Sequence, residues 1–406
     1  MSVLSPFRAL RPDPRAAPAV ASVPYDVVTT DEARALAAGN PLSFLRVTRA
    51  EIDLPPETGP YDAAVYAQAV RNLEDLKRAA PLVLDDEPSL YLYRLRMGAH
   101  EQTGICGTFS LDEYDRGLIK KHEKTRRDKE DDRTRHIVEL RAQTGIVFLT
   151  FARSDAVSAV VSRARRQAPL YDFAAPDDVA HTIWRVTGAD AQALVDAFAA
   201  LPALYIADGH HRAASAARAR AELGARGDRA ASRFMAVAFP DCEVQILAYN
   251  RVVKDLGGQT PQAFLDALGR RMPVTAGGPA APARRSQAGM YLAGAWHTVT
   301  LPAPAAGAAR ADTLDVELLH QHVLAPVLGI GDVRADTRID FVGGGRGTAE
   351  LERLVKAGRA AVAFSMYPVG IGDLVAIADA GGIMPPKSTW FEPKLRDGLL
   401  VHLVYS

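Results

Sequence analysis

Apolar and polar positions follow two rhythms along the chain, one typical of helices and one typical of strands. Residues 61–80 carry apolar side chains at helical spacing, with Val65, Ala69, Leu73 and Leu76 on one face, which predicts an amphipathic helix. Residues 90–97 and 105–111 have the pattern of strands and are expected to pair with each other. Residues 243–250 predict another strand, and residues 290–301 a hairpin.

Local signals mark a helix start and a dense cluster of charge. Thr29, followed three positions later by Glu32, has the pattern of a capping box, so a helix is expected to begin there. Residues 120–141 carry both charge signs at high density, which is typical of a solvated helix with salt bridges along it. Because short strands and helices alternate in no regular order, the fold class is predicted to be α+β (mixed α/β).

The most informative segment is residues 205–212. A short apolar strand stops, one glycine permits a tight turn, and a helix follows; the turn reads Asp208-Gly209-His210-His211-Arg212. Free backbone N–H groups at a helix start attract anions, and an arginine adds a bidentate donor for phosphate oxygens. Histidines at this point donate to phosphate or relay a proton, and the aspartate caps the helix, orients a histidine or holds a metal ion. The alternative is a capped helix that displays two exposed histidines.

Other segments offer residues that would complete such a site. Asp26, in the segment Pro24-Tyr25-Asp26, is a candidate general base or a plain turn aspartate. His122 and Glu123 stand at the head of the charged run, in which Arg126 and Arg133 offer a basic clamp, although the pattern alone favours a solvated surface. Near the end of the chain, Lys387 lies in a segment rich in proline, lysine and aromatic residues and is placed to reach a phosphate.

Composition narrows the classes of function. The 48 Lys and Arg balance the 48 Asp and Glu, and this zero net charge argues against a dedicated nucleic-acid binder. Two cysteines are too few for a multi-cysteine zinc site. No apolar window approaches the length of a signal peptide core or a membrane span, so a cytoplasmic protein without a membrane partner is expected.

Four motifs together resemble a known family. They are Pro24-Tyr25-Asp26, His122-Glu123-Lys124-Thr125, the turn at residues 208–212, and the closing segment Met384-Pro385-Pro386-Lys387-Ser388-Thr389-Trp390-Phe391-Glu392-Pro393-Lys394. This combination is similar to the prokaryotic domain-of-unknown-function family 1015, and the resemblance runs from Phe7 to Leu400. Proteins of that family are often described as similar to chromosome-partition ParB proteins.

The resemblance implies a ParB/sulfiredoxin-like core. It places a phosphate-binding catalytic region in residues 1–255 and a C-terminal accessory α/β domain in residues 256–406. In that fold a Gly-x-His-Arg turn binds nucleotide phosphates, and Gly209, His211 and Arg212 fit it. The fold also includes free serine kinases. The chain departs from ParB in lacking a helix-turn-helix after the turn, and from sulfiredoxin in having Asp208 and His210 where the catalytic cysteine would be.

The expected function is therefore a kinase that transfers a phosphoryl group from ATP, ADP or pyrophosphate to a small hydroxyl substrate, most readily L-serine. Such transfer requires positioning, charge neutralisation and one base. Asp26, Glu123 and His122 are the catalytic candidates, and Asp208 is the candidate ligand of Mg²⁺. The phosphate-binding candidates are Asp208, Gly209, His210, His211, Arg212, Arg126, Arg133 and Lys387.

Two alternatives stay open at this point. One is a ParB-like nucleotide-binding regulator or DNA-associated protein, and the other is a phosphate-ester hydrolase that uses the same anion site with water as the acceptor. The sequence leaves the oligomeric state open, with a homodimer among the options.

Overall fold

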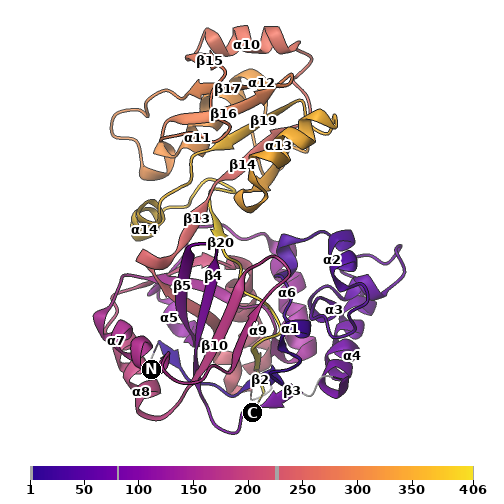
Figure 1. Cartoon of the computed structure of the whole chain (residues 1–406), viewed down its shortest axis with the longest axis vertical. Coiled ribbons are helices and arrows are strands. Elements are labelled where there is room, and N and C mark those ends of the chain that lie inside the picture. Colours follow the sequence, from indigo (N-terminus) through magenta and orange to yellow (C-terminus); the bar gives the residue numbers. More distant parts are fainter. Residues whose placement is uncertain (1–2, 80–81, 225–227, 406) are drawn as a thin grey trace. The chain divides into compact units, whose positions relative to one another are not determined.

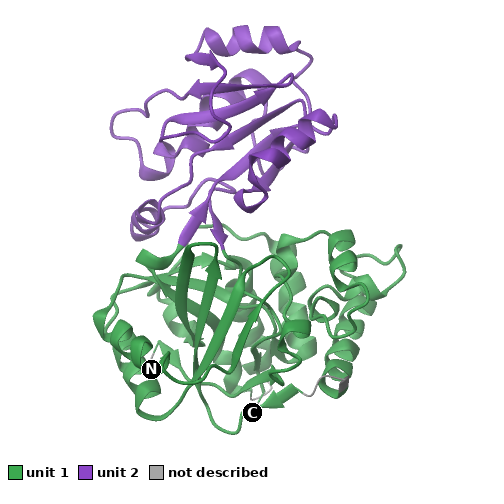
Figure 2. Cartoon of the chain, viewed as in Figure 1, with its two compact units in different colours: residues 1–244, 393–406 green, residues 245–392 purple. Residues whose placement is uncertain are grey.

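The computed structural model describes residues 3–79, 82–224 and 228–405, and it divides into two compact units (Figures 1 and 2). Unit 1 comprises Met1–Val244 and Pro393–Ser406, and unit 2 comprises Gln245–Glu392. The sequence-based division at residue 255 gives two continuous segments. In the structure, unit 1 is discontinuous, because the end of the chain returns to it. The return occurs because β21 (Val401–Leu403) pairs with the N-terminal strand β2 (Ala9–Pro12).

A large mixed sheet forms the body of unit 1. Its strand order is β6-β11-β8-β12-β5-β4-β10-β9, with β1 on β5. The bounds are β1 Leu4–Ser5, β4 Leu90–Met97, β5 His100–Ser110, β6 Ile119–Lys120, β8 Val147–Phe151, β9 Tyr171–Ala174, β10 Ala180–Val186, β11 Leu204–Asp208 and β12 Arg233–Pro240. The predicted pairing of residues 90–97 with 105–111 is confirmed by the antiparallel β4–β5 ladder. Parallel pairing occurs between β6 and β11 and between β8 and β12.

Helices α7 (Asp155–Ala164), α8 (Gly188–Ala199) and α9 (His210–Gly224) pack on this sheet. Their buried leucine, valine, alanine and phenylalanine side chains pack with those of the sheet in one apolar cluster. This core supports the strands and the helix that carry the site described below. Burial of apolar surface of this extent is the dominant favourable contribution to folding.

A second, smaller core of unit 1 is built around α4 (Ala63–Ala79) and a sheet of order β3-β2-β21-β7, with β3 at Leu82–Leu84 and β7 at Ala142–Gln143. The predicted apolar face of α4 is confirmed, because Val65, Ala69, Leu73 and Leu76 are all buried in this core. The predicted end of that helix, Ala80, lies outside the described residues. Three short helices complete this region, α1 at Ala17–Val20, α2 at Thr30–Ala37 and α3 at Leu45–Thr48, and the capping box of Thr29 and Glu32 is present on α2.

The charged run differs from the simple solvated helix that its pattern predicts. Helix α6 begins only at Arg127 and ends at Leu140, while α5 (Leu111–Asp115) and β6 precede it. One face of α6 packs inward and buries Asp132, His136, Ile137 and Leu140. The residues between β6 and α6 form a loop, which leaves His122 and Glu123 at the end of a strand instead of on a helix surface.

Unit 2 has a sheet of order β15-β17-β16-β19-β14-β18. Its strands are β14 Tyr249–Val253, β15 Val274–Ala276, β16 Gln287–Leu292, β17 Ala295–Thr300, β18 Ile339–Gly343 and β19 Val362–Met366. Its helices are α10 Pro261–Gly269, α11 Asp315–Leu319, α12 Ala325–Leu328, α13 Gly347–Lys356 and α14 Ile371–Asp379. The predicted hairpin is confirmed as β16–β17. The single strand predicted over residues 243–250 is wrong, because β13 (Gln245–Leu247) pairs with β20 (Trp390–Glu392) and β14 joins the main sheet.

The fold class is mixed α+β, as predicted, with sheets and helices in both units (Figure 1). None of the helices in the described ranges combines the length and the apolar character that a membrane crossing requires.

Candidate active site

Two parallel strands end side by side and bring separate motifs together. Strand β11 pairs with β6 in parallel, with Leu204 opposite Ile119 and Tyr205 opposite Lys120. Parallel strands have their carboxyl ends at the same edge of a sheet. The residues that follow β6, His122 and Glu123, therefore lie beside the residues that follow β11, which open α9. The His122–Glu123 segment and the turn at residues 208–212 were both predicted from the sequence as candidates. The pairing of β6 with β11 explains why they lie in one site.

The turn between β11 and α9 depends on Gly209. Its φ is +91°, a backbone conformation that L side chains rarely adopt, and a Cβ there would lie 3.4 Å from the Val147 Cα atom and from the Arg212 Cδ atom. A bulge in the β8–β11 ladder between Ile206 and Asp208 precedes the turn. The turn aims the N-terminus of a fifteen-residue helix, with its partial positive charge, at the edge where β6 ends.

His122 and His210 meet at this edge as neutral rings. Their centroids are 4.4 Å apart in an edge-to-face arrangement, and the His210 Nε2 atom accepts a hydrogen bond from the His122 backbone N–H at 3.4 Å. The remaining ring proton of His210 therefore sits on Nδ1, 3.7 Å from a carboxylate oxygen of Glu123. Burial lowers the pKa of His122 to about 4 and holds that of His210 well below its usual value. Glu123 is 43% exposed, so it faces both the histidine and the solvent.

Arg212 connects α9 to the N-terminal segment. Its Nη2 atom donates to both carboxylate oxygens of Asp26 at 2.8 and 2.9 Å, and its Nη1 atom donates to the Ile146 carbonyl. Asp26 belongs to a short 3₁₀ helix at Tyr25–Val27, far from Arg212 in sequence. Burial alone would lower the pKa of Arg212, but Asp26 and Asp208 more than offset this effect and the pKa is raised. The guanidinium is thus a permanent buried cation at the helix start.

Asp208 forms an ion pair with Lys394, which the C-terminal return brings into unit 1. The Lys394 Nζ atom lies 2.9 Å from the Asp208 Oδ2 atom. Burial would raise the pKa of Asp208, but Lys394 and Arg212 hold it well below its usual range. The carboxylate that was predicted to hold Mg²⁺ thus already binds the ammonium group of Lys394. The described residues contain no group of three or more His, Cys, Asp or Glu arranged for a metal ion. In this structure Asp208 acts as the partner of Lys394, and its assignment as a ligand of Mg²⁺ stays a prediction.

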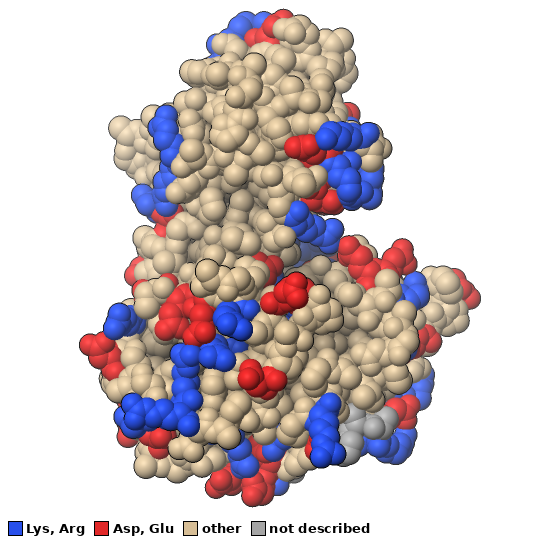
Figure 3. Space-filling model, in the orientation of Figure 1, with Lys and Arg blue, Asp and Glu red and all other residues tan. Residues whose placement is uncertain are grey.

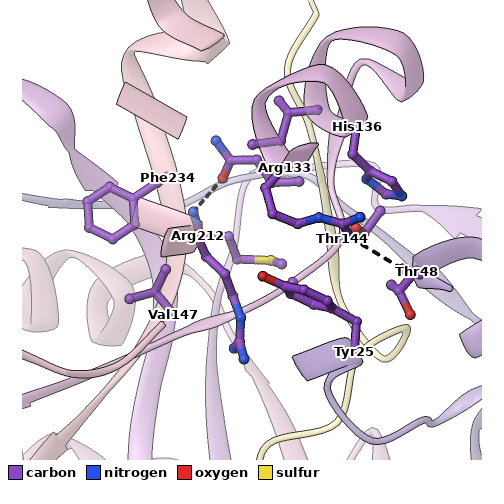
Figure 4. A pocket seen from close by; sticks show the side chains of 12 residues that line it. Tyr25, Thr48, Arg133, His136, Thr144, Val147, Arg212 and Phe234 are labelled. Atoms are coloured by element: carbon purple, nitrogen blue, oxygen red, sulfur yellow. Dashed lines mark hydrogen bonds between the residues drawn. The ribbon is translucent and has the colours of Figure 1, made fainter. Parts of the chain in front are cut away.

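A cavity of about 30 Å³ lies behind Arg212 (Figure 4). The Tyr25 ring lies between two guanidinium groups, with its centroid 4.3 Å from the Arg133 Cζ atom and 5.8 Å from the Arg212 Cζ atom. Arg133 is partly buried and donates to Asp132 at 2.8 Å and to the Thr48 carbonyl at 3.3 Å. A cavity of this size holds about two water molecules, which excludes a nucleotide from it. A nucleotide at this site would have to lie outside, at the helix start.

Arg126 and Lys387 occupy different surroundings from the other predicted phosphate ligands. The Arg126 side chain is 68% exposed and pairs with Asp128 at 2.8 Å, while its backbone N–H donates to the His211 Nε2 atom at 3.0 Å. Lys387 belongs to unit 2, where its Nζ atom lies 5.6 Å from the centroid of the Tyr249 ring. Acidic and basic side chains are interspersed on the face of unit 1 that Figure 3 shows, in keeping with the zero net charge.

One residue of this region was missed by the sequence analysis. Asp397 is 1% exposed, and neither of its carboxylate oxygens makes a hydrogen bond of good geometry among the described residues, although the Ile146 backbone N–H faces the group. The Arg212 Nε atom is likewise buried without a partner in the described part of the chain. Buried polar atoms without partners are rare and costly, and they concentrate at functional sites. The only sequence signal for Asp397 is its place just after Lys394, before Gly398, in the closing segment.

Comparisons with solved structures find distant likenesses. A conserved hypothetical protein from Pyrococcus furiosus is 15% identical with a TM-score of 0.37, and the match covers 73% of this chain and 95% of that one. A free serine kinase in complex with AMP is 12% identical with a TM-score of 0.37, covering 72% and 92%. SbnI with a C-terminal truncation from Staphylococcus aureus is 12% identical with a TM-score of 0.38, covering 73% and 87%.

No curated protein matches the chain. A family model described as "Protein of unknown function (DUF1015)" matches residues 4–317. The matched range includes Asp26, the His122–Glu123 segment and the turn at residues 208–212, and it covers well over half of the chain. The protein belongs to the DUF1015 family.

Proposed function

We propose that the protein is a phosphotransferase that moves a phosphoryl group from a nucleotide or pyrophosphate to the hydroxyl group of a small substrate, with L-serine as the first candidate. The observation that carries this proposal is the meeting of β6 and β11, which sets Glu123 and two neutral histidines beside the N-terminus of α9 and the buried Arg212. The resemblance of the Gly209–Arg212 turn to the phosphate-binding turn of ParB/sulfiredoxin-like proteins supports the same assignment.

The binding half of the site fits a phosphate. The helix start offers backbone N–H groups and a positive dipole end, and two cations lie close by, Arg212 paired with Asp26 and Lys394 paired with Asp208. Phosphoryl transfer is catalysed mainly by positioning and charge neutralisation, so such a cluster supplies most of what the reaction requires. His210, whose ring is neutral, and His211 complete the cluster as hydrogen-bonding groups.

Glu123 is the better candidate for the general base. Both oxygens of Asp26 accept hydrogen bonds from Arg212, which leaves that carboxylate to hold the arginine. Glu123 lies 3.7 Å from the His210 ring and is open to solvent on its other side. In the proposed step Glu123 takes the proton of the acceptor hydroxyl while that oxygen forms a bond to the transferred phosphorus and the bond to the donor's leaving phosphate breaks.

The test is product analysis with purified protein. L-serine is incubated with ATP, ADP or pyrophosphate, each with and without Mg²⁺, and O-phosphoserine is measured by mass spectrometry. We expect phosphoserine with at least one donor. Absence of phosphoserine with all three donors would remove serine kinase, and release of inorganic phosphate without serine would favour the hydrolase alternative.

A variant pair tests the base. Glu123→Gln keeps the size of the side chain but removes the base, and we expect it to lower turnover at least about a hundredfold with little change in donor affinity. Glu139→Gln, on α6 and paired with Arg135, is the matched control and should leave turnover unchanged. Equal turnover of the Glu123→Gln variant and the wild type would remove Glu123 from the mechanism.

A further inference from the structure

The C-terminal segment that returns to unit 1 is fixed in place from several sides. The Asp397 N–H donates to the Ser22 carbonyl at 2.8 Å and the Ser22 N–H donates back to the Asp397 carbonyl at 3.1 Å. The Arg396 Nε atom lies 3.4 Å from the His181 Nε2 atom, and the Arg396 backbone N–H donates to the Tyr93 hydroxyl at 3.3 Å. These contacts hold the Asp397 carboxyl group at a defined position in the interior.

The burial of that carboxyl group is costly for stability. It is almost fully buried; neither oxygen makes a hydrogen bond of good geometry among the described residues, and the Ile146 backbone N–H that faces it offsets only part of the cost of burial. Removing an ionised carboxylate from water without donors costs several kcal/mol, so such a group tends to take up a proton instead. Ile146 connects this carboxyl group to the proposed anion site, because its N–H faces Asp397 and its carbonyl accepts a hydrogen bond from Arg212. The same C-terminal segment supplies Lys394, which points to a role at the anion site and not in the core alone.

The charged and titratable groups around Asp397 come from four elements. They are Arg212 on α9, Asp26 on the 3₁₀ helix, Arg133 on α6 and Tyr93 on β4. Burial raises the pKa of Asp397 to about 7; Arg212 opposes the rise and Asp26 adds to it. Asp26 pairs with Arg212 and Asp208 pairs with Lys394, so Asp397 is a further carboxyl group near the Arg212 guanidinium and lacks a cation of its own.

We propose that Asp397 is a positioning residue that acts through Arg212 and sets the charge of the anion site. The inference rests on the proposed function, because it assumes that the α9 start binds phosphate. When Asp397 carries a proton, Arg212 and Asp26 form a neutral pair and an incoming anion meets no net repulsion. When Asp397 is ionised, the cluster of three side chains has one net negative charge, which weakens anion binding.

Sulfate is the appropriate probe, because its charge stays constant between pH 5.5 and 8.5 whereas phosphates titrate in that range. The affinity of the wild type for sulfate is measured by calorimetry across this range at constant ionic strength. We expect binding to weaken roughly tenfold from the acidic to the alkaline end, the effect of one nearby charge. In Asp397→Asn, which is neutral at every pH, affinity should stay near the acidic value of the wild type throughout.

Two variants sharpen the test. Asp26→Asn removes the neighbour that raises the pKa of Asp397, so the step in sulfate affinity should move to lower pH. Asp177→Asn removes a half-exposed carboxylate that pairs with Arg396 on the same segment, and it should keep the wild-type step. If Asp397→Asn does not fold, the wild-type profile and the shift in Asp26→Asn still decide the question.

The outcomes separate the two proposals. A step that is absent from the wild type, or that persists in Asp397→Asn, overturns the role of Asp397 while the anion site stands. Failure of the wild type to bind sulfate at any pH overturns the anion site, and with it both proposals. A ligand-free measurement adds to this: the melting temperature of Asp397→Asn relative to the wild type should rise as the pH rises from 5 to about 7 and then level off, because the unfolded wild type releases the Asp397 proton at lower pH than the folded wild type does.

Discussion

At the scale of single residues, Arg212 is the centre of the candidate site. It is buried, it binds both oxygens of Asp26 and the Ile146 carbonyl, and its Nε atom has no partner in the described part of the chain. Gly145 and Gly209 leave room for its side chain, since a Cβ at either position would lie 3.2 to 3.4 Å from the Arg212 Cδ atom. A planar guanidinium suits this place because it holds a carboxylate with two parallel bonds.

Arg212→Lys tests whether the anion site needs the planar guanidinium of Arg212 or only its positive charge. A lysine keeps the positive charge but cannot make two parallel bonds to Asp26, so we expect affinity for ADP or pyrophosphate to fall roughly tenfold and stability by about 1–2 kcal/mol. Calorimetric titration and urea unfolding measure the two effects. Arg218→Ala, on the same helix, removes an arginine that pairs with Glu130 and Asp131 and serves as the control. Unchanged affinity in Arg212→Lys would contradict this account.

At the scale of elements, local patterns predicted local structure well. The face of α4, the capping box of α2 and the β16–β17 hairpin all depend on residues close in sequence. The proximity of the His122–Glu123 segment to the α9 turn was harder to predict from the sequence. It depends on the parallel pairing of β11 with β6, a strand of only two residues. Asp397 was missed for the same reason, since its burial arises from a bridge to Ser22 across almost the whole chain.

Gly209→Ala tests the turn that opens α9. Because Gly209 has a φ of +91°, a Cβ strains the backbone even though its nearest neighbours are at ordinary contact distance. We expect a loss of about 1–2 kcal/mol in the free energy of unfolding, together with weaker pyrophosphate binding, since the helix start would tilt away from the edge. Gly224→Ala, at the other end of α9 with open space around it, should change stability by less than about 1 kcal/mol. Equal effects of the two substitutions would show that the turn is not special.

At the scale of the whole molecule, the buried histidines of unit 1 determine the response to acid. Burial lowers the pKa of His122, His136 and His402 to about 4 and that of His181 to about 3, and it holds that of His210 well below its usual value. Unfolded histidines titrate near pH 6.5, so the unfolded chain binds protons first and stability falls as the pH drops from about 6.5 towards 4. Asp397, whose folded pKa is raised, works in the opposite direction.

We therefore expect unfolding free energy to fall by several kcal/mol between pH 7 and pH 5, at about 2 kcal/mol for each buried histidine less the gain from Asp397. Thermal and urea unfolding across this range measure the slope. His402→Gln removes one titrating group that contacts the Ala230 carbonyl and the Phe7 ring, and it should make the slope shallower. A slope identical to that of the wild type would show that His402 is not held neutral.

The path of the chain predicts that unit 2 is removable. Gln245 and Glu392, its first and last residues, are direct partners in the β13–β20 ladder, so the chain leaves unit 1 and returns to it at neighbouring points. Joining Val244 to Pro393 through a short glycine-serine linker should leave the sheet of unit 1, the α9 turn and the return of Lys394 and Asp397 intact. We expect the shortened protein to unfold in a single cooperative transition and to bind sulfate with the pH profile of the full chain.

Deleting residues 393–406 from it should abolish that transition, because β21 is the inner strand between β2 and β7. A shortened protein that folds but has lost sulfate binding would show that unit 2, with Lys387, contributes directly to the anion site.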